Sequence, residues 1–169
     1  PLDGADLGVR HGEHSEYPFN RFLLQKETVI PVASPGYLAR HGTLDECTSL
    51  DDHVLGHLNE SPRLPWQKYL SEMGYPPSSD ASDMFFSDYG LLLQAVIKGQ
   101  CMGLGWQHVI AHELEQKGLV PAASRQYQTG MSYYIVTPND HAIRPEVVSV
   151  RDWLLSELPA ASRNETMPA

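Results

Sequence analysis

Apolar and polar positions along the chain predict strands and helices in alternation, and the clearest run lies at residues 84–109. It begins with three apolar residues suited to a short buried strand. Ser87 and Asp88 follow with side-chain oxygens that can cap a helix, and apolar residues then recur at helical spacing up to a glycine that can end it. Residues 102–105 predict a second strand, whose glycines allow a backbone or a ligand to approach closely. A strand, helix and strand of this length predict a parallel pair with a helical crossover, which is α/β architecture.

The same patterns predict elements on both sides of this run. Strands are expected at residues 5–10, 21–33 (one strand, or two nearly continuous ones), 119–121 and 130–137, and helices at 34–42, 65–73, 108–116 and 145–158. Ser34 can cap the helix at 34–42, where Pro35 suits the first turn and Gly42 can end it. Residues 43–64 predict only a helical turn near 49–53 and a strand near 54–57. Residues 159–169 have the composition of a disordered tail.

Charge and cysteine usage narrow the function classes. The 169 residues carry a formal net charge of -9, from 12 basic and 21 acidic residues, without a Lys/Arg cluster. Because neutralised phosphates drive nucleic-acid affinity, this chain alone is a poor DNA binder. It shows neither a leader nor an apolar run long enough for a bilayer, which predicts a soluble protein. Cys47 and Cys101 lie far apart, which favours a reduced, cytoplasmic protein, although two thiols could in principle pair.

The most enzyme-like pattern is His108 and His112, which share one face of a predicted helix. A metalloprotease helix needs a glutamate directly after its first histidine, and Val109 stands there, so the motif fails. His53 and His57 have the same spacing where no helix is predicted, and surface histidines are the favoured interpretation of both pairs. We therefore expect no enzyme, no metal and no cofactor. A zinc hydrolase using His108 and His112 is an alternative that metal analysis would test.

Seven segments carry a resemblance to a known family. They are ADLGVRHG at 5–12, RFLLQKETVIPVASPGYL at 21–38, PWQKYL at 65–70, FFSDYGLLLQAVIKGQCMGLG at 85–105, ELEQKGLV at 113–120, YYIVTP at 133–138 and VRDWLLSEL at 150–158. In this order they resemble the effector-binding domain of the LysR-type bacterial transcription regulators, most closely the branch around the glycine-cleavage activator. The resemblance covers nearly the whole chain.

The resemblance implies an α/β fold like that of the type II periplasmic binding proteins, with two lobes joined by crossover strands and an effector site between the lobes. Residues 1–30 and 133–158 would belong to lobe I, and residues 31–132 to lobe II. The family's winged helix-turn-helix DNA reader and the opening part of lobe I are absent from this sequence, so we expect a fragment with an incomplete first lobe. Promoter DNA would bind through the absent domain, in a homodimer or homotetramer. The exposed face of helix 88–98 is the candidate dimer surface.

The matched motifs also imply effector-binding residues. The expected set is Arg10, Ser34, Ser87, Asp88, Tyr89, Trp106 and Gln107. Family members commonly carry a small hydroxyl residue where Tyr89 stands and a basic residue where Trp106 stands, so this cleft is more aromatic. A tryptophan face attracts cations, and Asp88 disfavours a carboxylate. Among amino acids, betaine or choline-like compounds and small carboxylates, a cationic or zwitterionic effector is therefore favoured.

Five of these candidates also have a structural explanation, which is packing for Tyr89 and Trp106, capping for Ser87 and Asp88, and solvation or an ordinary salt bridge for Arg10. A second function class is a periplasmic solute-binding protein that serves transport. That protein would need an export leader and a complete first lobe. The ending VRDWLLSEL favours the regulator.

Overall fold

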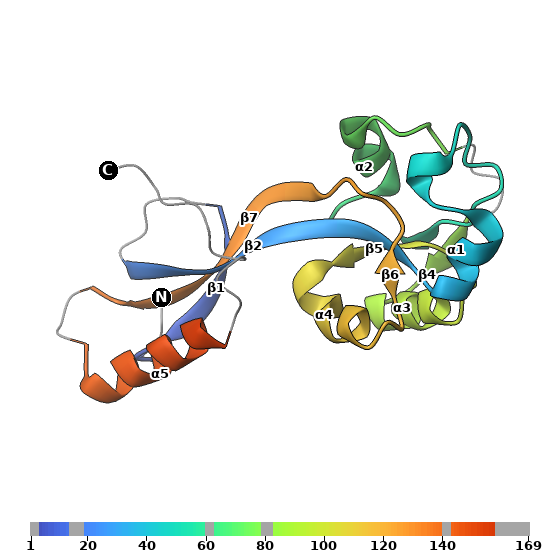
Figure 1. Ribbon diagram of the computed structural model, residues 1–169. Coiled ribbons are helices and arrows are strands. Elements are labelled where there is room, and N and C mark those ends of the chain that lie inside the picture. Colours follow the sequence, from blue (N-terminus) through green and yellow to red (C-terminus); the bar gives the residue numbers. More distant parts are fainter. Residues whose placement is uncertain (1–3, 14–18, 60–62, 79–82, 140–142, 158–169) are drawn as a thin grey trace. The chain divides into compact units, whose positions relative to one another are not determined.

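The computed structural model describes residues 4–13, 19–59, 63–78, 83–139 and 143–157. Figure 1 shows the elements, which are β1 (Gly8–Gly12), β2 (Phe19–Ala33), α1 (Pro35–His41), the short 3-10 helix η1 (Leu44–Glu46), β3 (Gly56–Leu58), α2 (Trp66–Met73), β4 (Met84–Phe86), α3 (Tyr89–Ile97), β5 (Gly103–Trp106), α4 (Gln107–Glu115), β6 (Val120–Pro121), β7 (Tyr127–Pro138) and α5 (Pro145–Ser156). The predicted α/β class is confirmed, and most predicted elements occur with ends shifted by a few residues. The predicted tail at 159–169 lies outside the described residues. Within the described part of the chain, no helix is both long and apolar enough to cross a membrane.

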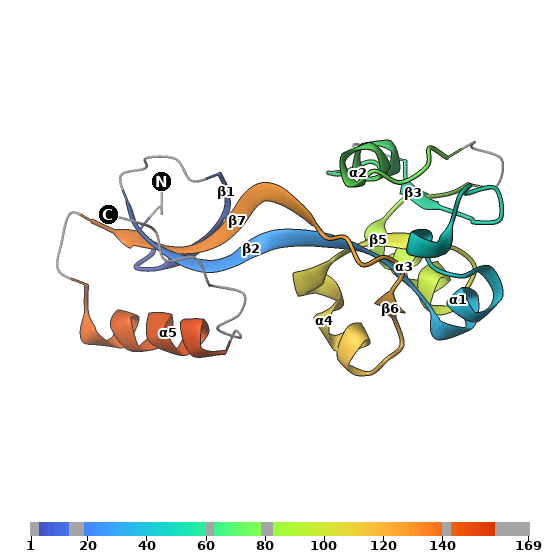
Figure 2. The ribbon, with the colours of Figure 1, turned by 45° about the horizontal axis from the view of Figure 1, so that its top comes forward.

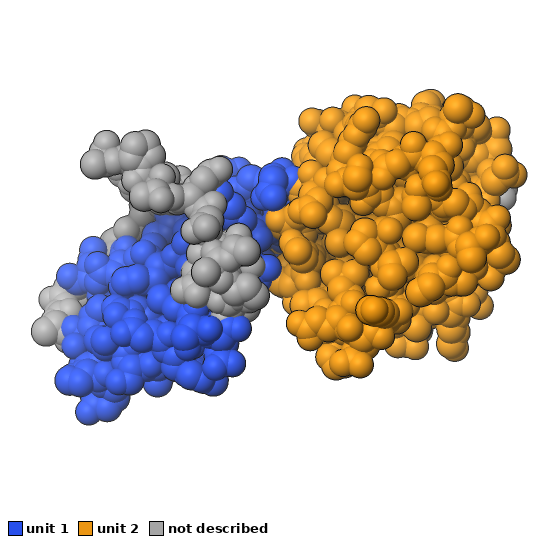
Figure 3. Space-filling view, in the orientation of Figure 1, with its two compact units in different colours: residues 1–27, 128–169 blue, residues 28–127 orange. Residues whose placement is uncertain are grey.

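The chain divides into two compact units, coloured in Figure 3. Unit 1 contains residues 1–27 and 128–169, and unit 2 contains residues 28–127. Strand order in the larger sheet is β1-β7-β2-β5, with β6 also paired to β2, and β3 and β4 form a second sheet. The lobe boundaries predicted after residues 30 and 132 fall within β2 and β7 and stay a prediction.

Unit 1 is built around the antiparallel pair of β1 and β7, in which Gly8 lies opposite Val136. Beside this pair, His11 Nε2 lies 3.0 Å from Oε1 of Glu27, whose side chain is buried. A guanidinium contact joins α5 to β2, since Arg151 lies 4.5 Å from the ring centroid of Phe22. These polar and cation–π contacts join β1 and α5 to β2 within the unit.

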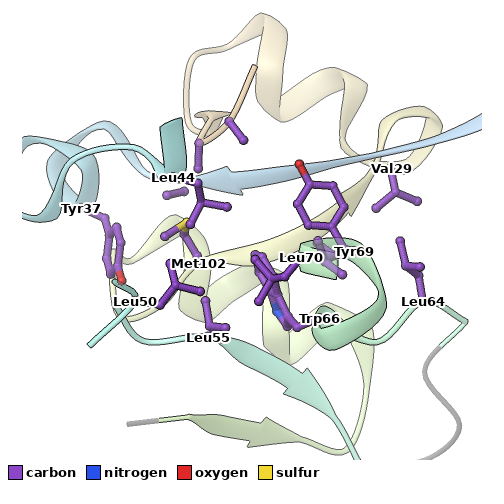
Figure 4. Packing of buried hydrophobic residues seen from close by; sticks show 14 of the residues in the cluster. Val29, Tyr37, Leu44, Leu50, Leu55, Leu64, Trp66, Tyr69, Leu70 and Met102 are labelled. Carbon is purple, nitrogen blue, oxygen red and sulfur yellow. The ribbon is translucent and has the colours of Figure 1, made fainter. Parts of the chain in front are cut away.

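Unit 2 has helices on both sides of its strands, and the side chains of β2 alternate between them. Val29 and Ala33 pack into one apolar cluster, while Ile30 and Val32 pack into the other. Figures 1 and 2 show α2 on one side of the strands and α3 with α4 on the other. Helix α2 supplies Trp66, Tyr69 and Leu70 to the first cluster, where Figure 4 shows them beside Leu55 and Leu64. Burial of each large apolar side chain of this kind contributes about 1.5–3 kcal/mol to the free energy of unfolding.

Two glycines of β5 permit close packing of the helices on the second side. A Cβ at Gly105 would lie 2.4 Å from Ile110 Cδ1 of α4, and one at Gly103 would lie 2.8 Å from Val96 Cγ2 of α3. The close approach that the sequence predicts at these glycines is therefore made by helix side chains of the protein itself.

The predicted direct pairing of strand 84–86 with strand 102–105 is wrong. Strand β4 pairs in parallel with β3, so that Gly56 lies opposite Met84, and β5 pairs with β2 in the antiparallel direction. A single parallel bridge joins Leu55 to Met102. The β3 segment is thus inserted between the two strands. The reason is that apolar periodicity predicts a strand at 54–57 but does not encode which strands are its neighbours.

Candidate functional site

A pocket lies in unit 2, where β3, the start of α2, the start of α3 and the end of β5 meet. The space that its side chains enclose is small, about 20 Å³, and the hollow opens to solvent. The lining consists of residues 56–58 and 64–66, Tyr89, Leu92, Leu104 and Trp106. This lining is mostly apolar and aromatic with a few polar groups, which is typical of small-molecule sites.

Tyr89 holds the end of β5 against the start of α3. Asp88 caps this helix by accepting a hydrogen bond from the Leu91 amide at 3.0 Å, which places Tyr89 in the first turn. The Tyr89 hydroxyl donates to the Leu104 carbonyl and accepts from the Trp106 amide, both at 3.2 Å. Burial raises the pKa of Tyr89 to about 12, while the Trp106 amide acts in the opposite direction. The hydroxyl therefore stays protonated and keeps both bonds.

Trp106 presents an unused donor at this pocket. The side chain is only 6% exposed, and its Nε1 has no hydrogen-bond partner among the described residues. The neighbouring indole of Trp66, by contrast, donates to the Gly56 carbonyl at 3.0 Å. A buried donor without a partner costs about 1–3 kcal/mol, so it needs an explanation. A ligand that accepts a hydrogen bond at this pocket would remove that cost.

Charged groups surround the pocket. The guanidinium carbon of Arg63 lies 5.9 Å from the Trp106 ring centroid. Helix α4 begins at Gln107, directly after Trp106, so its positive amino end lies beside the pocket. His57 Nε2 lies 2.9 Å from Asp83 Oδ2, a distance that suits an ion pair although the two groups are not aligned as a hydrogen bond.

The structure brings together two of the seven predicted site residues. Tyr89 and Trp106 line the pocket, and their rings meet edge to face with centroids 5.4 Å apart. Four other residues of the predicted set lie in unit 2 but outside the pocket lining, namely Ser34, Ser87, Asp88 and Gln107. Arg10 lies in strand β1 of unit 1. Ser34 caps α1 by accepting from the Tyr37 amide at 3.2 Å. The role of all seven in binding stays a prediction.

Sequence reasoning missed residues 56–58 and 64–66, which supply much of the lining, and Arg63 beside it. No motif distinguishes residues 56–58, Arg63 or Leu64. Pro65 and Trp66 belong to the segment PWQKYL and to the predicted amphipathic helix at 65–73, which indicates burial without indicating a pocket.

A half-buried thiol and a buried imidazole form a second polar cluster in unit 2. Cys47 Sγ lies 2.8 Å from Nε2 of His53, which is 4% exposed. Burial, together with the charges of Glu46 and Asp52, raises the pKa of Cys47. Burial and the nearby His41 lower the pKa of His53, with Asp52 acting in the opposite direction. The two groups are therefore neutral near pH 7, which is not the thiolate setting of a cysteine nucleophile.

The histidine pairs of the sequence do not assemble a larger donor set in the described part of the chain. There, no group of three or more His, Cys, Asp or Glu side chains is arranged to hold a metal ion. Cys47 and Cys101 are both free thiols. The pocket beside Trp106 thus remains the best-supported candidate for a binding function.

Comparison with known families agrees with a small-molecule-binding domain. The model of the LysR substrate binding domain family matches residues 2–159. The chain therefore belongs to this family. It is 25% identical, over 158 residues, to the glycine cleavage system transcriptional activator of Escherichia coli (strain K12), an alignment that covers 94% of this chain and 51% of that protein. The chain thus spans about half the length of the curated relatives it matches.

Two solved structures share the fold. The effector domain of the transcriptional regulator AmpR of Pseudomonas aeruginosa has a TM-score of 0.65 at 17% identity, covering 96% of this chain and 76% of that one. The regulatory domain of AphB in Vibrio vulnificus has a TM-score of 0.67 at 15% identity, covering 94% of this chain and 78% of that one. The predicted fold class, α/β of the periplasmic-binding-protein-like type, is confirmed. The family match supports the regulator and not the transport alternative.

Proposed function

We propose that the chain is the small-molecule-sensing domain of a bacterial LysR-type transcriptional regulator in the cytoplasm. Membership of the LysR substrate binding domain family and the similarity to a transcriptional activator support this proposal. The DNA-binding part would belong to a longer protein that assembles as a homodimer or homotetramer. A chain with a formal net charge of -9 is itself poorly suited to phosphate contacts.

The observation that carries the binding function is the pocket in unit 2 with the Trp106 indole at its wall. Trp106 lines this pocket, and its buried N–H group has no acceptor among the described residues. Aromatic and aliphatic side chains around it would enclose an apolar body, and the indole would fix the orientation of one acceptor group. We expect Tyr89 to position Trp106, and Arg63 to add charge at the same place.

Helix α3 offers a route from this pocket to a subunit contact. Tyr89 lines the pocket at the start of α3, whereas Leu91 is 53% exposed and Phe85 of the adjoining β4 is 63% exposed. Exposed apolar side chains of this kind suit the dimer surface expected on α3. An effector would change the subunit arrangement only if it binds one arrangement more tightly than the other. We expect this difference to act through the first turn of α3.

Thermal unfolding of the chain with a metabolite panel tests the proposal. The panel would contain amino acids, betaine and choline compounds, and small carboxylates. At a hundred times its Kd, a ligand specific to the native state adds about 2.7 kcal/mol, which corresponds to a rise in Tm of about 5–11 °C for a chain of this size. We expect at least one class to raise the Tm with saturable dependence on concentration.

Trp106→Ala should abolish this rise. The matched control is Trp153→Ala, because Trp153 lies in unit 1 and is 58% exposed. A panel in which no class raises the Tm, or a rise of equal size in Trp106→Ala, would contradict the assignment of the site.

A further inference from the structure

The surroundings of Trp106 favour a ligand that accepts hydrogen bonds and carries negative charge. The indole N–H can only donate, and the side chain that carries it is buried at the pocket wall. A carboxylate oxygen would satisfy this donor and gain the added strength of a charge-assisted bond. A quaternary ammonium group has no acceptor to offer to Nε1.

A cation already occupies the neighbourhood of the Trp106 ring. The guanidinium carbon of the exposed Arg63 lies 5.9 Å from the ring centroid, just within the limit of about 6 Å for a cation–π contact. Tyr89 contacts the same ring edge to face, with centroids 5.4 Å apart. A bound ammonium would be repelled by Arg63 and by the positive amino end of α4, whereas a carboxylate would be attracted by both.

Neither Asp83 nor Asp88 is among the residues that line the pocket. Asp88 accepts a hydrogen bond from the Leu91 amide at 3.0 Å and is not part of the pocket lining. Asp83 lies 2.9 Å from the Nε2 atom of His57. Asp88, the carboxylate expected from the sequence to favour a cationic effector, lies outside the lining, so that preference does not follow from its position.

We infer that this pocket selects a small monocarboxylate with an aryl or branched alkyl body over a quaternary ammonium compound, with Trp106 Nε1 as the donor and Arg63 as the attracting charge. The inference rests on the proposed function and specifies the ligand class of that site. Leu64 and Trp66 supply apolar surface for the body of the ligand. The order of preference between carboxylates and betaines expected from the sequence is thereby reversed.

The Trp106 N–H signal in a proton–nitrogen correlation spectrum tests this inference directly. The chain has 3 tryptophans and therefore gives three indole signals, and Trp106→Phe identifies one of them by its loss. Two probes share a benzyl body and differ in charge, namely phenylacetate and benzyltrimethylammonium. We expect phenylacetate to move the Trp106 signal saturably downfield while the Trp153 signal stays in place, and benzyltrimethylammonium to leave both unmoved.

Two variants separate the roles of the donor and the charge. Trp106→Phe keeps an aromatic ring but removes the N–H group, and it should weaken phenylacetate binding about 10-fold to 100-fold, the range expected for a lost hydrogen bond to a charged group. Arg63→Gln should weaken it several-fold while the Trp106 signal still moves at saturation. The backbone signals of each variant show whether it is folded as the parent chain is.

The outcomes distinguish the inference from the proposed function. Benzyltrimethylammonium binding that moves the Trp106 signal while phenylacetate does not would overturn the inference alone. Unweakened phenylacetate binding to Trp106→Phe would do the same. Stabilisation by other compounds of the metabolite panel, with neither an aryl nor a branched alkyl carboxylate binding, would also overturn only the inference. A panel in which nothing binds would overturn the proposed function itself.

Discussion

Tyr89→Phe isolates the hydroxyl group that joins α3 to the end of β5. The change keeps the ring against Trp106 but removes the bonds to the Leu104 carbonyl and the Trp106 amide, each 3.2 Å long. Two net hydrogen bonds are worth about 1–3 kcal/mol together, and leaving the amide without a partner places the loss toward the upper end. For a chain of this length, that loss corresponds to a fall in Tm of about 2–12 °C.

The assay is urea unfolding followed by tryptophan fluorescence in a Trp153→Phe background. The remaining indoles, Trp66 and Trp106, both lie in unit 2, so the signal reports on the unit that contains the change. Tyr75→Phe is the matched control, because the Tyr75 hydroxyl donates to an exposed Asp45 carboxylate at 2.5 Å, where water can replace it. The control should lose less than Tyr89→Phe does, because it leaves no buried backbone amide without a partner. Equal losses in the two variants would refute the role assigned to the Tyr89 hydroxyl.

Three further predictions follow from packing and titration. Gly105→Ala should destabilise the chain by about 1–3 kcal/mol, because its Cβ would lie 2.4 Å from a side chain of α4. Gly12→Ala, whose Cβ would have no atom within 4 Å, should be nearly neutral, and equal urea midpoints for the two variants would contradict this prediction. Burial raises the pKa of Cys47 and raises the pKa of Cys101 to about 11. Iodoacetamide at pH 7, followed by mass spectrometry, should therefore label Cys47 slowly and Cys101 only on unfolding, and rapid labelling of either thiol in the folded chain would contradict this prediction. Burial lowers the pKa of His53 below 6.5, so the unfolded state binds more protons and the free energy of unfolding falls as the pH drops through 6.5. His53→Gln should reduce this dependence of the free energy of unfolding on pH, measured by urea unfolding at several pH values, and an unchanged dependence would exclude His53 as its source.

Local chemistry made most elements predictable. Ser34 accepts the Tyr37 amide at the start of α1, and Gly42 ends the helix with a positive φ of 78°, as the sequence indicates. Asp88 caps α3 in the same way. These signals succeed because each depends on residues within one or two turns of the chain.

Strand order and the pocket depend on contacts that local signals do not carry. Gly56 allows β3 to lie against Met102, whose carbonyl would be 3.2 Å from an added Cβ, and this packing separates β4 from β5. The same insertion brings residues 56–58 to Tyr89 and Trp106, which are distant in the sequence. Tyr89 and Trp106 were predicted from the motifs that resemble the family, in which both stand at element ends, whereas Arg63 belongs to none of these motifs.

A crystal structure of the chain with the panel compound that most raises its Tm tests the central claim most directly. The account predicts that the compound lies in the unit 2 pocket, with an acceptor atom within about 3 Å of Trp106 Nε1 and its apolar body against Leu64 and Trp66. A compound bound only by residues outside this pocket, with Trp106 Nε1 still lacking an acceptor, would contradict it.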